Sequence, residues 1–441
     1  MFLPVKSGAA EMTQPVIGFG GMTHLGLVSG VAASEKGFKV VCFDPAAARV
    51  AALRKGDLPV SEPQLEPLVS KNAARLSFTS STADLRACDV IYVAPDVPTD
   101  GEGASDLDPI DALLARVFDA ARADAVIVVL SQVPPGYTRG KQRDGRILYY
   151  QVETLIFGRA VERALQPERF IVGCADPAAP LPAAYRSFLE AHGCPILPMR
   201  YESAELAKIS INCCLIASVT VANTLAELSE RIGADWSEIA PALRLDRRIG
   251  QHSYLAPGLG IAGGNLERDL ATVLRISQSV GSEASTIQAF LDNSAHRRDW
   301  ALRTLHGEVF ARNPDATIGV LGLAYKENTH STKNSPSLAL IQRLKPWAIR
   351  VYDPVVPPSA ADHPKAVGAK DALDVAKGVD ALAVMTPWPA FTALKPADLA
   401  RAMRGKTVLD PYRVLDGAAV AAAGLDYLTL GAPPLRARAG N

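Results

Sequence analysis

Residues 15–44, PVIGFGGMTHLGLVSGVAASEKGFKVVCFD, contain the pattern that decides the fold of the first half of the chain. A short apolar run breaks into glycines, a stretch with helical character follows, and a second β-branched run ends at Asp44. This order of strand, glycine turn, helix, strand and acid is typical of a dinucleotide-binding unit. The glycines let the backbone approach a pyrophosphate at the helix N-terminus, and the acid binds the ribose hydroxyls.

The glycine spacing departs from the usual fingerprint. Gly18 and Gly20 match its first two positions, but the helix glycine is Gly26, three residues late, after an additional Met-Thr-His. A glycine pattern alone is a weak signal, and it gains weight here from the flanking strands and the acid. An acidic residue at Asp44, where a basic one would suit NADP, favours NAD. The sequence therefore predicts NAD as the cofactor, held by these three glycines and Asp44.

Apolar runs alternate with helical stretches after this unit, and each ends at a polar or proline-rich loop. The runs cover residues 75–78, 89–95, 125–136, 170–176 and 194–199. Strand C-termini of an open parallel sheet line a ligand crevice in this way. The pattern predicts an α/β fold with a doubly wound parallel sheet. A second strand–glycine–helix unit begins at residues 317–325, and further strands are expected at 349–354, 381–388 and 407–413.

The centre of the chain, Ser203–Gly233, is predicted to be one long helix. It has no proline, and its one glycine stands at the end, where a C-terminal cap belongs. No charge occurs between Lys208 and Glu227, and apolar residues face almost every direction, so we expect the helix to be buried in protein or in lipid. A core helix joining two domains is favoured over a membrane span because six polar residues interrupt the run: Ser210, Asn212, Ser218, Thr220, Asn223 and Thr224.

The composition excludes several other classes of protein. The 441 residues carry no formal net charge, so no global field favours nucleic acid or an anionic membrane. The cysteines form no CxxC pair and have no metal-ligand spacing, and reduced thiols in a cytoplasmic protein without a metal site are expected. They are Cys42, Cys88, Cys174, Cys194, Cys213 and Cys214. The predicted organisation is a flexible tail (1–14), an NAD-binding Rossmann domain (15–200), a central helical domain (201–305) and a second Rossmann-like domain (306–441).

Seven segments, in order along the chain, resemble motifs of the UDP-glucose/GDP-mannose dehydrogenase family. They are Gly56–Leu65, Val93–Ile110, Ser131–Thr138, Gln151–Ala160, Ala204–Asn212, Leu245–Asp269 and Gly319–Ile341. The resemblance implies an NAD domain, a helical middle and a C-terminal domain for the nucleotide sugar, with a UDP-hexose as the first candidate. In that family a sugar CH₂OH group is oxidised twice to a carboxylate, with two NAD consumed. A homodimer through the central helix is also a family expectation.

The resemblance also implies roles for individual residues. Lys208 and Asn212 would stabilise the alkoxide, Asp269 and a water would take the proton, and Thr99 and Glu153 would position substrate, water and nicotinamide. Pro98 and Ser131 would join the cofactor site. The residues implied for substrate binding are Arg248, Tyr254, Gly260, Tyr325, Lys326, Lys333 and Arg413.

The departure with the largest chemical consequence is at Asn265, which stands where the family has its nucleophilic cysteine. A thiolate adds to the aldehyde, and the thiohemiacetal then loses a second hydride to give a thioester that water hydrolyses. A carboxamide only hydrogen-bonds. Other matched positions have changed as well: Val152 for Pro, Phe157 for Glu, Arg268 for Lys, Lys333 for Arg and Pro387 for Glu.

Several hypotheses remain open. A dehydrogenase without the thiol would stop at the aldehyde or oxidise the hydrated aldehyde directly. Alternatively, an epimerase would recycle bound NAD, or a binding paralogue would retain the sites without chemistry. A 2-hydroxy-acid or 6-phosphogluconate-type dehydrogenase is disfavoured by the segment 319–336. The sequence leaves the sugar and the nucleotide undetermined.

Overall fold

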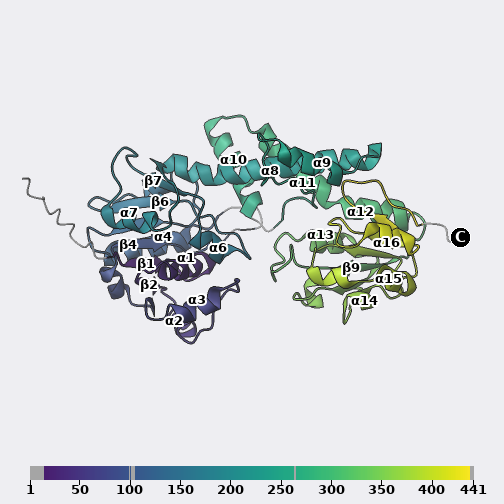
Figure 1. Cartoon of the computed structure of the whole chain (residues 1–441), viewed down its shortest axis with the longest axis horizontal. Coiled ribbons are helices and arrows are strands. Elements are labelled where there is room, and N and C mark those ends of the chain that lie inside the picture. The colour runs from purple at the N-terminus through teal and green to yellow at the C-terminus, as the bar shows by residue number, and fades with distance from the viewer. Residues whose placement is uncertain (1–13, 99, 101–104, 263–264, 438–441) are drawn as a thin grey trace, which may run out of the picture. The chain divides into compact units, whose positions relative to one another are not determined.

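The chain folds as two compact units, unit 1 (residues 1–210) and unit 2 (residues 211–441), each of which contains a sheet (Figure 1). The computed structural model describes residues 14–98, 100, 105–262 and 265–437. The predicted N-terminal tail therefore lies almost wholly outside the described residues.

Unit 1 contains an eight-stranded sheet of order β3-β2-β1-β4-β5-β6-β7-β8. The strands are β1 Ile17–Gly20, β2 Val40–Phe43, β3 Leu76–Thr79, β4 Val90–Val93, β5 Val126–Val129, β6 Ile147–Gln151, β7 Phe170–Cys174 and β8 Ile196–Arg200. The predicted doubly wound sheet is confirmed, with one correction: β7 runs antiparallel to β6, because the short segment after β6 contains only a small helix. Strand β6 was not predicted; of its residues, only Gln151 belongs to one of the motif segments.

The helices of unit 1 cover this sheet. They are α1 His24–Glu35, α2 Ala47–Arg54, α3 Leu65–Lys71, α4 Asp108–Ala120, α5 Tyr137–Gly140, α6 Ala160–Leu165 and α7 Ala183–Glu190. Helix α1 is buried almost all round, which explains its apolar sequence. Its Gly30 allows close packing on β2, because a Cβ there would lie 2.9 Å from Cys42 Sγ.

The long central helix α8 spans Tyr201–Ile232 and ends at Gly233, whose φ of +83° is that of a C-terminal cap, as predicted. The expectation that it is buried on all sides is wrong. Val221, Leu225, Leu228 and Ile232 are 41–65% exposed, because their spacing of four, three and four places them along one line of the helix that the chain leaves uncovered. Among the described residues, α8 alone has the length and hydropathy of a membrane span, and 33% of its most apolar window is buried.

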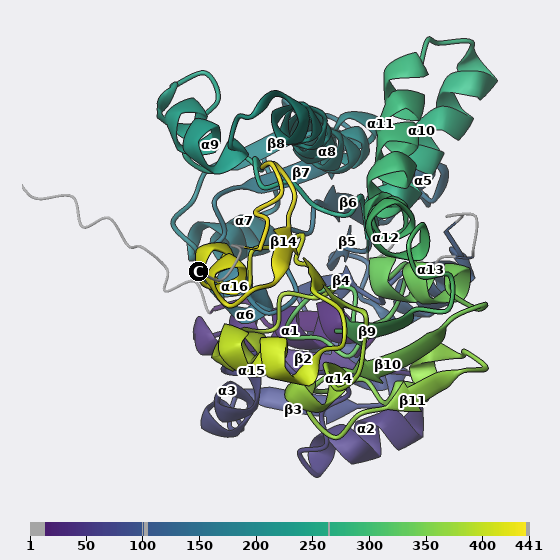
Figure 2. The same cartoon turned by 90° about the vertical axis from the view of Figure 1, so that its right-hand side faces the viewer.

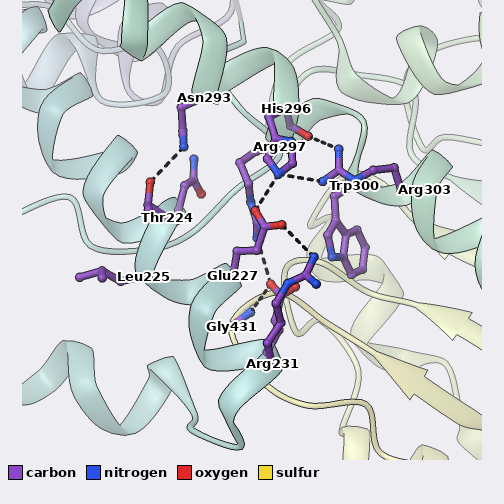
Figure 3. A network of polar contacts seen from close by, with 12 residues as sticks. Thr224, Leu225, Glu227, Arg231, Asn293, His296, Arg297, Trp300, Arg303 and Gly431 are labelled. Atoms are coloured by element: carbon purple, nitrogen blue, oxygen red, sulfur yellow. Dashed lines mark hydrogen bonds and ion pairs between the residues drawn. The ribbon is translucent and has the colours of Figure 1, made fainter.

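The helical part of unit 2 packs on the second half of α8. It comprises α9 Trp236–Leu245, α10 Asn265–Val280, α11 Ser285–Arg298 and α12 Trp300–Leu305. The fully buried Arg297 of α11 contacts Glu227 Oε2 and Glu230 Oε1 of α8, each at 3.0 Å. Figure 3 shows Arg297 beside Glu227 in this polar network. Glu230 Oε1 also accepts the backbone N–H of Gly431 at 2.9 Å. Arg297 thus joins α11 to α8, and its partner Glu230 joins α8 to a loop near the C-terminus.

Unit 2 ends in a six-stranded parallel sheet of order β11-β10-β9-β12-β13-β14. Its strands are β9 Thr317–Leu321, β10 Ala348–Tyr352, β11 Ala366–Gly368, β12 Ala381–Val384, β13 Thr407–Leu409 and β14 Asp426–Leu428; β9, β10 and β11 are seen side by side in Figure 2. The longer helices around it are α13 Pro336–Arg343, α15 Pro396–Ala402 and α16 Gly417–Ala422. The prediction of two Rossmann-like sheets and a helical middle is confirmed.

Candidate active site

The glycine turn of unit 1 has the backbone geometry of a dinucleotide-binding unit. Strand β1 ends at Gly20, and the chain turns at Gly21, where φ is +89° and a Cβ would lie 2.7 Å from Pro95 N. A Cβ on Gly26 would lie 2.0 Å from Gly21 O, so the late glycine allows the close approach expected of the third glycine. Gly21 was missed by the sequence analysis, although the doubled glycine signals it.

Asp44 lies at the end of β2, as predicted, and is 1% exposed. Its Oδ2 accepts the N–H of Met22 at 2.8 Å and contacts Arg49 Nη1 at 2.8 Å, while Oδ1 accepts the N–H of Ala46 at 2.9 Å. The relative positions of the strand, turn, helix and acid thus suit binding of the adenosine half of NAD. Both carboxylate oxygens already have partners within the chain.

The additional Met-Thr-His supplies Thr23 and His24, the N-cap and the first residue of α1. His24 stacks on Phe157 with ring centroids 4.2 Å apart, and its Nε2 lies 2.8 Å from Glu62 Oε1. Glu62 also accepts the N–H groups of Gly158 at 3.0 Å and Ala160 at 3.2 Å. The contact between His24 and Phe157 therefore joins two departures from the family pattern: the insertion, and the loss of a glutamate at position 157.

Unit 1 brings together two of the predicted catalytic residues. Lys208 Nζ lies 2.5 Å from Glu153 Oε1 and donates to Glu153 O at 3.1 Å. Their side chains are only 12% and 17% exposed. Glu153 Oε2 accepts the N–H of Leu155 at 2.9 Å, which fixes the carboxylate. A largely desolvated ammonium group held in this way can stabilise a developing negative charge.

Glu205, which the sequence analysis did not single out, fixes the first turns of α8. Its fully buried carboxylate accepts the N–H groups of Gly136 at 2.6 Å and Thr138 at 2.8 Å. Burial raises the pKa of Glu205. Because Glu205 lies three residues before Lys208, this contact sets the position of Lys208 relative to the predicted cofactor loop. An acid three residues before Lys208, in the segment Ala204–Asn212, was the available signal.

Unit 2 brings together Asn212 and Asp269. Asn212 Nδ2 donates to Asp269 Oδ2 at 2.5 Å, and Arg268 Nε lies 3.4 Å from Asp269 Oδ1. Asp269 is 1% exposed. Burial and then Asp269 raise the pKa of the neighbouring Cys213 to about 11, so its thiol is protonated near neutral pH and is a poor substitute for the missing nucleophile. Helix α10 begins at Asn265, whose side chain lies outside the described part of the chain.

The three predicted substrate residues in the loop before α10 differ in their surroundings. Arg248 pairs with Asp246 at 2.6 Å, and Tyr254 is 49% exposed. Gly260 has a φ of +78°, and a Cβ there would lie 2.4 Å from Ser294 O. Only glycine fits this position, and it brings the loop onto α11.

The remaining predicted site residues occur in both units. Arg413 donates to Asp235 Oδ1 at 2.7 Å and to Ser237 Oγ at 2.9 Å, so it holds the start of α9. Burial raises the pKa of Tyr325, and Lys326 Nζ lies 5.7 Å from its ring centroid. Lys333 and Pro98 are exposed, whereas Ser131 is fully buried and donates to Pro95 O at 2.5 Å. Thr99 lies outside the described residues.

Comparisons with known proteins identify the family. Its NAD binding domain matches residues 15–188, its central domain residues 202–294 and its UDP binding domain residues 319–417. The chain belongs to the UDP-glucose/GDP-mannose dehydrogenase family. It is similar to UDP-glucose 6-dehydrogenases of Bacillus subtilis, 30% identical over 96% of this chain and 93% of that protein, and of Pseudomonas aeruginosa, 30% identical over 95% and 97%.

Solved structures give the same result. A UDP-glucose dehydrogenase from Pyrobaculum islandicum has a TM-score of 0.80 at 27% identity and covers 95% of this chain and 100% of its own. A UDP-D-ManNAc dehydrogenase from Pyrococcus horikoshii, 22% identical with a TM-score of 0.81 over 94% and 99%, shares the fold. The chain is thus an NAD-dependent oxidoreductase of the nucleotide-sugar dehydrogenase class.

Proposed function

We propose that the chain oxidises the CH₂OH group of a UDP-hexose, or of a related nucleotide sugar, with NAD and releases the aldehyde. The buried Asn212–Asp269 contact carries the proposal, because it keeps a proton acceptor beside an amide donor where the family has its catalytic pair. The Lys208–Glu153 pair of unit 1 supports it.

Each residue has a defined task in the first oxidation. Asp269, through a water, accepts the hydroxyl proton at a carboxylate oxygen. Lys208 and the Asn212 amide stabilise the alkoxide as it forms, and Glu153 fixes the Lys208 ammonium. The same carbon loses a hydride, for which NAD would supply the acceptor, so one C–H and one O–H bond break and a C=O bond forms.

The second oxidation is where Asn265 matters. In a thiol enzyme the thiolate adds to the aldehyde, and the resulting thiohemiacetal loses hydride to give a thioester. Asn265 has no comparable nucleophile, and the protonated Cys213 does not supply one. We therefore expect one NADH for each sugar oxidised.

Purified protein with NAD and a panel of UDP- and GDP-sugars tests this proposal. NADH is followed optically, and products are identified by mass spectrometry with a carbonyl trap. One NADH with a trapped aldehyde supports the proposal, and Asn265→Cys should then gain acid product. Two NADH with a uronate would contradict the role of Asn265.

Two other outcomes would replace the proposal. Binding of both ligands without NADH or any altered sugar would indicate a paralogue that binds without chemistry, as the changes at Asn265 and Phe157 would allow. An isomerised sugar without net NADH would indicate an epimerase that recycles its cofactor.

We further propose a cytoplasmic homodimer formed through α8. The exposed line Val221, Leu225, Leu228 and Ile232 has the spacing of a coiled-coil seam. In Figure 3, Leu225 points away from the Arg297 network, so this apolar line is separate from the helix face that packs within unit 2. A second copy of α8 is the occupant that fits such a seam.

A further inference from the structure

The first turn of α1 already carries an anion from the chain itself. The Asp96 carboxylate, from the loop after β4, accepts the N–H of His24 at 2.9 Å and the N–H of Leu25 at 3.3 Å. In return, the N–H of Asp96 donates to Thr23 Oγ1 at 2.8 Å. Thr23 makes no side-chain cap of its own, so Asp96 replaces it as the cap of this helix.

These amides belong to the group that a dinucleotide pyrophosphate uses. In a strand–glycine–helix unit, the pyrophosphate accepts N–H groups from the turn and from the first turn of the helix. Here the N–H of Met22 donates to Asp44, and the N–H groups of His24 and Leu25 donate to Asp96. Two internal carboxylates therefore bind the donors of the predicted pyrophosphate site.

The insertion explains how this arrangement is held. The His24 ring is fixed between Phe157 and Glu62, which orients the backbone of the same residue toward Asp96. Asp96 itself is exposed, whereas His24 and Glu62 are buried. The helix start thus has buried contacts through His24, and the carboxylate on it lies at the solvent side, where it can leave.

We propose that Asp96 is an internal competitor of the cofactor and is displaced from the α1 N-terminus when the NAD pyrophosphate binds. A helix N-terminus stabilises an anion, but a carboxylate and a doubly charged pyrophosphate at the same amides repel each other. The cost of displacing Asp96 lowers the affinity for NAD, and Asp96 sets how strongly the cofactor is held. This inference rests on NAD binding at the glycine turn.

The test measures the binding of ADP-ribose, which has the pyrophosphate but no nicotinamide, and of adenosine, which lacks the pyrophosphate. Titration calorimetry on the full chain compares wild type with Asp96→Ala and Asp96→Asn; the second variant keeps the size and one acceptor but removes the charge. Asp176→Ala is the matched control, because Asp176 also caps a local turn, by accepting the N–H of Ala178 at 2.9 Å. It follows β7, which is antiparallel to β6, so it lies at the opposite edge of the sheet.

We expect Asp96→Ala to lower the Kd for ADP-ribose about tenfold and Asp96→Asn to lower it by less, since two charge-assisted hydrogen bonds no longer compete. Adenosine binding and the Asp176→Ala variant should be unchanged. The apo Asp96→Ala protein should melt at a lower temperature, because α1 loses its cap.

Three results would overturn the inference. One is an unchanged or higher Kd for ADP-ribose in both Asp96 variants. Another is an equal gain for adenosine, which would mean that Asp96 obstructs the whole nucleotide. If ADP-ribose and NAD bind to neither wild type nor variants, NAD binding at this turn fails together with the inference.

Discussion

At the residue scale, His192 makes stability depend on pH. Burial lowers the pKa of His192 to about 4, although its ring also contacts Phe188 O at 3.1 Å. The unfolded chain takes up this proton near pH 6.5, while the folded chain resists it, so stability is lost as pH falls from about 6.5 to about 4. The free energy of unfolding should fall by about 2–3 kcal/mol over this range from His192 alone.

Replacing His192 with Gln checks this, since glutamine keeps a donor for Phe188 O but does not titrate. Urea unfolding at pH 7 and pH 4.5 should show a smaller loss in His192→Gln than in wild type. His252→Gln, at an exposed histidine, serves as control. Equal losses in wild type and His192→Gln would show that His192 is accessible to protons in the folded state.

Residues also show where sequence analysis ends. Gly18, Gly20, Gly26 and Asp44 were predictable, because the dinucleotide-binding pattern restricts the residue type at each of these positions. The His24–Phe157 contact was not, since it joins an insertion to a substitution 133 positions later, and neither has a local signal. Asp96 was missed for the same reason: an aspartate in a loop is ordinary until the fold places it on a helix start.

At the element scale, the network around Arg297 holds α8 and α11 together in unit 2. Arg297 is fully buried, and its Nε has no hydrogen-bond partner. The side chains of Glu227 and Glu230 are 20% and 16% exposed. Arg297→Met removes the buried cation beside both carboxylates, of which Glu227 keeps contacts to His296 at 2.8 Å and Arg231 at 3.5 Å, and this should lower the free energy of unfolding by about 3–5 kcal/mol.

Chemical denaturation measures this loss, and a compensated variant separates charge from packing. Arg297→Met combined with Glu227→Gln and Glu230→Gln should recover much of the stability, because no unpaired charge remains. Arg303→Met is the control, since Arg303 is exposed and contacts only His296 in the network. If the triple variant is as unstable as the single one, the arginine acts by filling space.

At the scale of the whole molecule, most of the architecture followed from pattern. Buried parallel strands are short apolar runs, and both sheets were predicted from them. Strands β11 and β14 were missed because they are only three residues long, and β6 was missed although it begins with the run ILYY. The exposure of α8 could not be predicted in this way. Composition shows that a helix is apolar on most sides, but which side stays uncovered depends on how the rest of the chain packs.

That uncovered side supports a prediction about assembly. A second α8 would bury Val221, Leu225, Leu228 and Ile232, and a fully buried leucine contributes about 1.5–3 kcal/mol. Leu225→Glu puts a charge into this seam, so it should convert the dimer to monomer while the Arg297 network on the other face stays intact. Light scattering behind size exclusion measures the mass, and Leu245→Glu, at an exposed leucine of α9, is the control. A monomeric wild type, or a Leu225→Glu protein that still dimerises at the same concentration, would exclude α8 as the interface.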